Sequence, residues 1–185
     1  RVASTLGISR VRITGGEPLA RKGVVSLVRA VASVPGICDI SMTTNATMLA
    51  PVADELAGAG LKRVNISLDS LNPDAYARLT RRGDLASAIA GIHAAQRAGL
   101  GPIRLNAVVL RGINSDEIES LAALTLKHDW DVRFIEFMPF WGNGGLFGGE
   151  YVVPIDEIRR RVLAMGVEDR IAQRAAAKLT DVCAT

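Results

Sequence analysis

Aromatic residues are scarce in this sequence and make up only 4% of its 185 residues. Hydrophobic residues nevertheless account for 49% of the chain, so its core has to be built mainly from Val, Ile, Leu and Ala. A chain of this length buries enough surface for one substantial core and little more. The composition therefore predicts a single domain with an aliphatic interior.

Cysteine is almost as rare, with only Cys38 and Cys183, which are far apart and have no cysteine or histidine beside them. Metal ions and iron–sulfur clusters need three or four protein ligands, so these two residues cannot form such a site. We expect no disulfide, because no secretory signal is present. Cys38 lies beside Ile37 and Ile40 and is predicted to be a small core residue.

The sequence also lacks a long apolar run, a charged-then-apolar leader and a strong excess of one charge. Its net charge is +3, and the only basic run, 159–161, is predicted to be a solvated helix face rather than a nucleic-acid site. We therefore expect a cytoplasmic protein without a membrane or nucleic-acid partner. Because the chain begins with Arg1 and not with methionine, we expect a fragment or a processed chain.

Five strand-like apolar runs alternate with segments of helical periodicity. The strands are predicted at 11–14, 37–43, 63–68, 103–110 and 132–137, and the helices at 24–31, 49–59, 85–95, 118–124 and 155–163. Regular alternation of this kind is typical of right-handed βαβ units and a parallel sheet. The pattern predicts one α/β domain.

Polar residues gather where each predicted strand ends. The segments concerned are 14–17, 43–45, 67–70 and 136–139, together with Asn106 inside its strand. Each segment also has a local explanation. Threonines are common in strands, and the next helix could be capped by Asp69, Ser70 or Asn72. Met138 could fill a gap in the core. Ligands bind at the carboxyl edge of parallel sheets and barrels, so the five segments together predict a ligand site there.

These segments resemble the GTP 3′,8-cyclases, the radical S-adenosylmethionine (SAM) enzymes that open molybdenum cofactor biosynthesis. The matching motifs are Thr14-Gly15-Gly16-Glu17-Pro18-Leu19, Thr43-Thr44-Asn45, Val64-Asn65-Ile66-Ser67-Leu68-Asp69-Ser70-Leu71, Asn106-Ala107-Val108-Val109 and Phe134-Ile135-Glu136-Phe137-Met138-Pro139. The resemblance extends from the first residue to about Arg161 and implies a parallel (βα) barrel of the radical SAM type. It also implies the conversion of GTP to 3′,8-cyclo-7,8-dihydroguanosine triphosphate.

The resemblance implies a role for six residues. It assigns SAM contacts to Gly16 through its backbone, to Ser67 and to Met138. Backbone groups and a hydroxyl suit the amino and carboxylate groups of SAM, and a thioether suits its apolar parts.

The same resemblance assigns GTP contacts to Arg12, Thr43 and Arg104. Arginine suits the phosphates of a nucleotide. The family has lysine where this chain has Arg104, which keeps the charge but replaces a compact ammonium with a planar fork.

The cofactors of the family are SAM and [4Fe–4S] clusters, but this sequence departs from the family at the cluster ligands. The resemblance puts the first three-cysteine loop before Arg1, and the residues after Arg161 do not match the second cysteine segment. Cys38 is expected at the edge of the sheet opposite the ligand site. We therefore expect no metal ligands in this chain and no activity from the chain alone. We also expect an incomplete barrel of about five βα units over 1–165, which lacks its first strand, followed by a divergent, disordered tail over 166–185.

Two alternatives to a truncated cyclase remain open. The first is a non-catalytic remnant that binds nucleotide or SAM, or that pairs with an intact cyclase. The second is an aldolase-like, phosphate-binding barrel enzyme, although Lys22, Lys62, Lys127 and Lys178 all lie outside the predicted strands, where a Schiff-base lysine is normally buried. The missing first strand would leave an exposed edge beside 11–14, which predicts association into a homodimer.

Overall fold

The computed structural model describes residues 1–81, 83–139 and 148–166 and contains one parallel sheet. Its five strands lie side by side in chain order, and each pairs in parallel with the next. The strands are β1 (Arg10–Ile13), β2 (Asp39–Thr44), β3 (Arg63–Ser67), β4 (Ile103–Val109) and β5 (Trp130–Glu136). The predicted α/β class and the partial (βα) barrel of five units are thereby confirmed. The tail predicted over 166–185 falls, apart from Gly166, outside the described residues.

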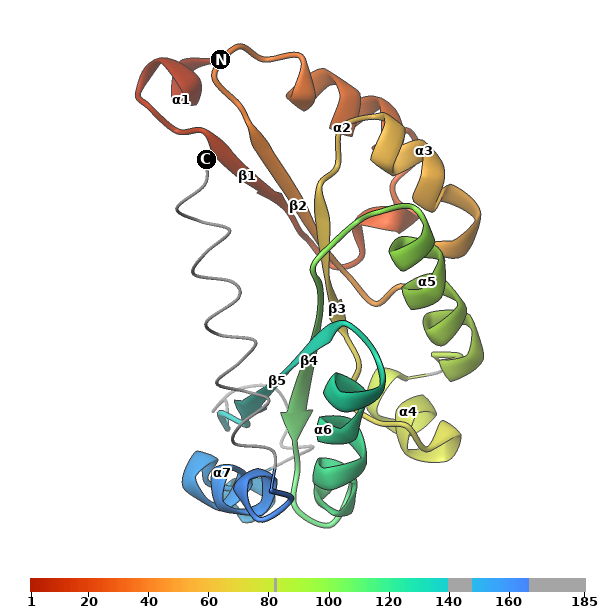
Figure 1. Ribbon diagram of the computed structural model, residues 1–185, viewed down its shortest axis with the longest axis vertical. Helices are drawn as coiled ribbons and strands as arrows, with labels where there is room; N and C mark the ends of the chain where they lie inside the picture. The colour runs from red at the N-terminus through yellow and green to blue at the C-terminus, as the bar shows by residue number, and fades with distance from the viewer. Residues whose placement is uncertain (82, 140–147, 167–185) are drawn as a thin grey trace.

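Figure 1 shows that most of the described helices line one side of this sheet, whereas α1 and α7 lie near its upper and lower ends. They are α1 (Val2–Thr5), α2 (Val24–Ala32), α3 (Ala53–Gly58), α4 (Pro73–Thr80), α5 (Leu85–Arg97), α6 (Ile118–Lys127) and α7 (Ile155–Leu163). Four 3₁₀ turns precede or join them: η1 (Pro18–Ala20), η2 (Ala50–Val52), η3 (Ser115–Glu117) and η4 (Gly149–Tyr151). In the described part of the chain, no helix is long and apolar enough to cross a membrane.

The alternation of side chains along β4 explains why one face of the sheet is apolar. Ile103, Leu105, Ala107 and Val109 are buried, and the residues between them are only half-buried. Successive strand residues point to opposite faces, so this pattern places every second side chain against the helices. The main core lies between the sheet and α2, α3 and α5, and its interior is largely aliphatic, as the composition predicts.

The close approach of α5 to the end of β2 depends on Gly91. A Cβ at this position would lie well within 3.0 Å of the carbonyl oxygen of Ala46, which is closer than real Cβ atoms come to a neighbour. Ala46 itself has a positive φ of 62° and is fully buried just after β2, so its loop is held between the sheet and α5. The absence of a side chain at Gly91 therefore sets how closely this loop and α5 pack.

Helix α7 is fastened at the far end of the sheet by polar contacts. The N–H of Ile155 donates to Glu136 Oε2 at 2.6 Å, and Arg161 pairs with Glu119 of α6 at 2.5 Å. Arg111, just after β4, pairs with Glu157 at 2.7 Å. The predicted solvated face at 159–161 is exposed at its first two residues, whereas Arg161 is half-buried in its ion pair with Glu119.

One predicted core residue is exposed. Cys38 lies before β2, which begins at Asp39 and not at Ile37, and its thiol is at the surface. Its backbone N–H donates to Ser9 O at 2.9 Å, so it belongs to the connection at the amino end of the sheet, where it is not covered by the core. The prediction failed because apolar neighbours in the sequence do not show whether a residue just before a strand is buried or exposed. The expected position of Cys38, opposite the ligand edge, is confirmed.

Candidate ligand site

The candidate site is the face of the sheet that the described helices do not cover, here called the inner face. Its side chains form rows across the strands, because paired residues in parallel strands point to the same side. The lower row contains Arg12, Ser41 and Arg63; the middle row contains Thr43, Asn65, Arg104 and Asp131; the upper row contains Ser67, Asn106 and Arg133. The polar residues of the strands thus converge on one surface.

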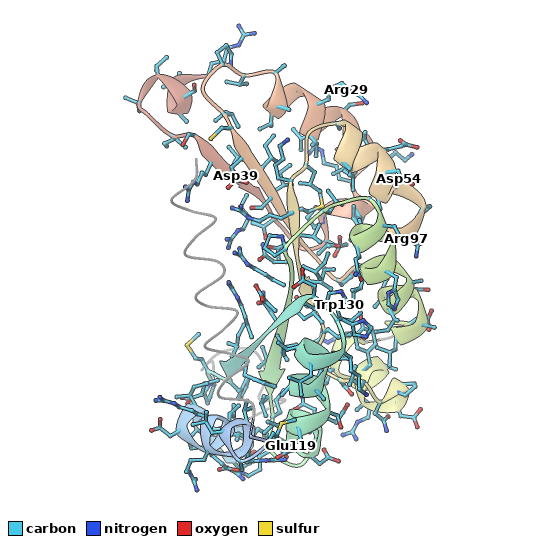
Figure 2. All side chains as sticks on the ribbon, viewed as in Figure 1. Arg29, Asp39, Asp54, Arg97, Glu119 and Trp130 are labelled. Carbon is cyan, nitrogen blue, oxygen red and sulfur yellow. The ribbon has the colours of Figure 1, made fainter. Side chains whose placement is uncertain are left out.

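This inner face has a surplus of positive charge. Its paired strand residues include five arginines and two aspartates: Arg10, Arg12, Arg63, Arg104, Arg133, Asp39 and Asp131. Figure 2 shows nitrogen-bearing side chains on the side of the sheet away from the helices, with Asp39 among them. Arg63 forms an ion pair with Asp39, which neutralises one member of the group.

Arg104 lies near the centre of this charge. Burial, followed by the guanidinium groups of Arg133 and Arg63, lowers the pKa of Arg104 from its usual value, while Asp131 opposes the shift. Arginine nevertheless remains protonated at neutral pH. A partly buried cation surrounded by further cations is stabilised by a bound anion, so the inner face is suited to a polyanionic ligand.

The three residues assigned to SAM lie at the upper rim, above the middle row. Gly16 and Ser67 are exposed, and Met138 has 79% of its surface exposed. An added Cβ on Gly15 or Gly16 would meet no atom within 4 Å, so the backbone there is open to a ligand. The alternative in which Met138 fills the core is wrong.

The three residues assigned to GTP lie lower, on the inner face itself. Thr43 and Arg104 flank Asn65 in the middle row, and Arg12 is one row below on β1. The charge of Arg12 contributes to the lowered pKa of Arg104, so the two cations are close enough to repel each other. The structure therefore brings Arg12, Thr43 and Arg104 onto one face and keeps them separate from the rim.

Glu17 holds the glycine-containing loop of the rim against the end of β2. One carboxylate oxygen accepts from the Thr44 hydroxyl at 2.6 Å and from Leu19 N–H at 3.0 Å, and the other accepts from Asn45 N–H at 2.7 Å. Because both of its oxygens accept hydrogen bonds from its own chain, this carboxylate has a structural task. Glu17 therefore positions Gly15 and Gly16, a role that the sequence did not reveal.

A second network fixes the ends of β3 and β4. Asn114 is fully buried: it accepts from Leu110 N–H at 2.7 Å and donates to Asp69 O at 2.6 Å and Val108 O at 2.9 Å. The Asp69 carboxylate accepts from Val108 N–H at 2.8 Å and so continues the ladder beyond β3. These side chains satisfy the backbone groups of β4 that extend past the end of its neighbour.

The same network extends to Glu117. Its carboxylate accepts from the Ser70 hydroxyl at 2.5 Å, Leu71 N–H at 2.6 Å and Asn72 N–H at 3.1 Å. Of the three candidate caps for α4, Asn72 fulfils that role, since its Oδ1 accepts from the N–H groups of Asp74 and Ala75. Asp69 and Ser70 instead connect neighbouring loops.

Burial of Asp69 predicts a specific pH dependence. Burial raises the pKa of Asp69 above its ordinary value, and the hydrogen bond from Val108 only partly offsets the shift. The folded state therefore holds this proton more tightly than the unfolded state, and the contribution of Asp69 to stability falls as the pH rises above about 4.

We expect Asp69→Asn to keep the bond from Val108 N–H and to remove this pH-dependent loss. The variant should gain stability relative to the wild type between about pH 4 and pH 7, with the whole difference reached above the raised pKa. Urea denaturation of both proteins at a series of pH values measures this difference in the free energy of unfolding. A constant difference across that range would contradict the assignment.

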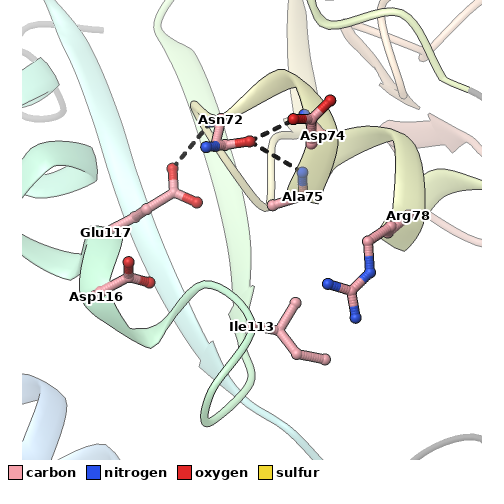
Figure 3. A pocket seen from close by; sticks show the side chains of 7 residues that line it. All are labelled: Asn72, Asp74, Ala75, Arg78, Ile113, Asp116 and Glu117. Carbon is pink, nitrogen blue, oxygen red and sulfur yellow. Dashed lines mark hydrogen bonds between the residues drawn. The ribbon is translucent and has the colours of Figure 1, made fainter.

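A shallow pocket of about 240 Å³ lies outside the inner face, between the loop before α4 and the loop before α6. Figure 3 shows Asn72 bonded to the first turn of α4, with Glu117 reaching the same loop. Asp74, Arg78 and Asp116 complete its polar wall. None of the six residues assigned to SAM or GTP lines this pocket.

The described residues do not suit an iron–sulfur cluster. Within 1–81, 83–139 and 148–166, no group of three His, Cys, Asp or Glu side chains is placed to hold a metal ion. Cys38 lies at the opposite end of the sheet from the rim, and Cys183 falls outside the described residues. The rim residues, by contrast, fit SAM, since they offer open backbone at Gly16, a hydroxyl at Ser67 and an exposed thioether at Met138.

In the described residues, a parallel sheet with helices packed on one face and polar residues on the other defines a partial (βα)-barrel protein. The family model described as the radical SAM superfamily matches residues 1–125. This chain therefore belongs to the radical SAM superfamily.

Curated relatives support the resemblance seen in the motifs. The chain is 50% identical over 162 residues to the GTP 3′,8-cyclase of Petrotoga mobilis, covering 88% of this chain and 50% of the relative. It is 53% identical over 157 residues to the GTP 3′,8-cyclase of Gloeobacter violaceus, covering 85% of this chain and 48% of the relative. The chain thus spans about half the length of the curated relatives it matches.

Solved structures support the fold. A radical SAM methyltransferase from Sphaerobacter thermophilus superposes with a TM-score of 0.66 at 20% identity, covering 89% of this chain and 51% of that one. A domain of pyruvate-formate lyase-activating enzyme from Bacteroides vulgatus superposes with a TM-score of 0.62 at 16% identity, covering 83% of this chain and 90% of that one. At these identities the likeness concerns the fold alone.

Proposed function

We propose that this chain carries the SAM- and GTP-binding face of a GTP 3′,8-cyclase of molybdenum cofactor biosynthesis, acting in the cytoplasm. The observation that carries the proposal is the placement of Arg12, Thr43 and Arg104 on one positively charged face, directly below a rim formed by Gly16, Ser67 and Met138. The names of the curated relatives give the same substrate. Half of those proteins lies outside the matched region, so turnover of GTP is proposed for the whole protein.

Each ligand meets groups suited to it. At the rim, the exposed backbone of Gly16 and the hydroxyl of Ser67 orient the amino and carboxylate groups of SAM, and Met138 covers an apolar part of it. On the inner face, Arg12 and Arg104 neutralise the phosphates, and the Thr43 hydroxyl donates to or accepts from the nucleotide. The radical chemistry comes from the cofactor, and the residues of this chain bind and orient the two ligands.

The alternative of a Schiff-base aldolase receives no support from the described lysines. Lys22, Lys62 and Lys127 all lie outside the strands. Self-association remains part of our proposal: β1 and β5 are each paired on one side only in the described sheet, and an unpaired strand edge favours pairing with a second copy.

Calorimetric titration of GTP into the full chain and two variants tests the binding proposal. Charge-assisted hydrogen bonds contribute about 1.5–3 kcal/mol each, so Arg12→Ala should weaken GTP binding by roughly tenfold to a hundredfold. Arg29→Ala is the matched control, because it removes the same side chain from α2 on the other side of the sheet (Figure 2). Equal loss in both variants, or no binding of GTP to the wild-type chain, would refute the proposal.

A further inference from the structure

The inner face contains a buried amide whose donor has no partner. Asn65 lies in the middle of β3 and has only 4% of its surface exposed. Its Nδ2 makes no hydrogen bond with any described residue. Its paired neighbours are Thr43 on β2 and Arg104 on β4, the two middle-row residues assigned to GTP.

The unpaired amide is one of a group. Arg104 Nε and Arg63 Nε are also buried without a partner among the described residues, and both belong to the inner face. Arg63 uses its terminal nitrogen for Asp39, which leaves Nε free for another acceptor. Folded proteins leave few buried donors unpaired, so three on adjacent strands of one face indicate an acceptor supplied by a ligand.

The chemistry of the group indicates which part of a ligand it meets. All three unpaired atoms are N–H donors, and two of them belong to cations, so the complementary group has several acceptor oxygens and negative charge. A phosphate chain meets both conditions, whereas a nucleobase carbonyl supplies one acceptor and no charge. A neutral amide between the cationic side chains adds direction to the contact without increasing their mutual repulsion.

From this juxtaposition we infer that Asn65 is a further substrate-contacting residue, whose amide N–H donates to a phosphate oxygen held between Thr43 and Arg104. The inference rests on the proposed GTP site and specifies its phosphate subsite. It also explains why a buried position is polar, since an apolar side chain would avoid the cost of an unpaired amide.

Two variants of the full chain separate a binding role from a structural one. Asn65→Asp replaces the donor with a negatively charged acceptor and should weaken binding of inorganic triphosphate and of GTP at least tenfold. Asn65→Leu has a similar volume and no polar group. It should retain or exceed the thermal stability of the wild type without ligand, and it should lose most of the stabilisation that triphosphate gives to the wild type.

Asn72→Asp is the control for charge, because Asn72 is exposed at the start of α4, away from the inner face. It should bind triphosphate as the wild type does. Wild-type affinity in both Asn65 variants would overturn the inference while leaving the GTP site in place. A loss measured with guanosine but not with triphosphate would also overturn it, because the contact would then be to the nucleoside.

If the wild type binds triphosphate but shows no preference for GTP over other nucleotides, the phosphate subsite stands and the guanine specificity of the proposed function fails. If the wild type binds neither, both proposals fail.

Discussion

Asn114→Asp is expected to lower the free energy of unfolding by about 3 kcal/mol or more, because the change converts a fully satisfied buried amide into a buried charge. Asn114 has 0% of its surface exposed and uses both ends of its side chain. Its Nδ2 donates to the carbonyl oxygens of Asp69 and Val108, so an aspartate would direct a carboxylate oxygen at two other acceptors. Both the lost bonds and the new repulsion oppose folding.

Urea denaturation at pH 7, followed by circular dichroism, measures the effect. Asn72→Asp is again the matched control, because the exposed Asn72 uses only its Oδ1, as a helix cap that aspartate also provides. Its stability should stay within about 0.5 kcal/mol of the wild type, as for most surface substitutions. Similar losses in the two variants would show that the network around Asn114 does not hold the ends of β3 and β4 together.

The second large effect is expected at Gly91, where alanine should destabilise the chain by about 1–3 kcal/mol. In most helices this substitution is favourable by about 1 kcal/mol, so the expected sign is reversed. The reversal follows from the clash of the new Cβ with the Ala46 carbonyl oxygen, a backbone atom in a buried loop. Either α5 or the loop after β2 has to move.

Gly58→Ala is the control for helix propensity. Gly58 is the last residue of α3, is exposed, and would meet no atom within 4 Å if it carried a Cβ. This variant should be neutral or slightly stabilising. Thermal denaturation of the two variants and the wild type distinguishes the effects: a stabilised Gly91→Ala protein would mean that α5 does not pack closely on Ala46.

The sheet and the shared face of the candidate site residues could be predicted from the sequence because both depend on local patterns. The apolar runs around Val64 and Leu105 show strand periodicity, and alternation along a strand decides which side chains share a face. Once the strands are parallel and in this register, Thr43, Ser67 and Arg104 lie on one face, with Ser67 at the carboxyl end of β3 and Arg104 near the amino end of β4. Strand boundaries shifted by up to two residues, most clearly before Asp39.

The supporting contacts could not be predicted in this way because they join residues that are distant in the chain. Glu117 belongs to the first turn before α6 by its sequence, yet its carboxylate binds the loop between β3 and α4. The same holds for Glu17 and the end of β2. The unpaired donor of Asn65 also required the three-dimensional structure, since sequence shows which residue lies in a strand but not which of its atoms lacks a partner.

The rows of the inner face also have a consequence for how specificity can change. Side chains on one face recur every second residue, so neighbouring rows are separated by about 6.6 Å along the strand. Ser67 belongs to the upper row and Asn65 to the middle row of the same strand, and Arg63 lies one step lower. Substitutions at the middle and lower rows can therefore alter the choice of substrate while the cofactor contacts above them remain unchanged. Substitutions at every second residue of one strand can therefore pair the same cofactor with different substrates.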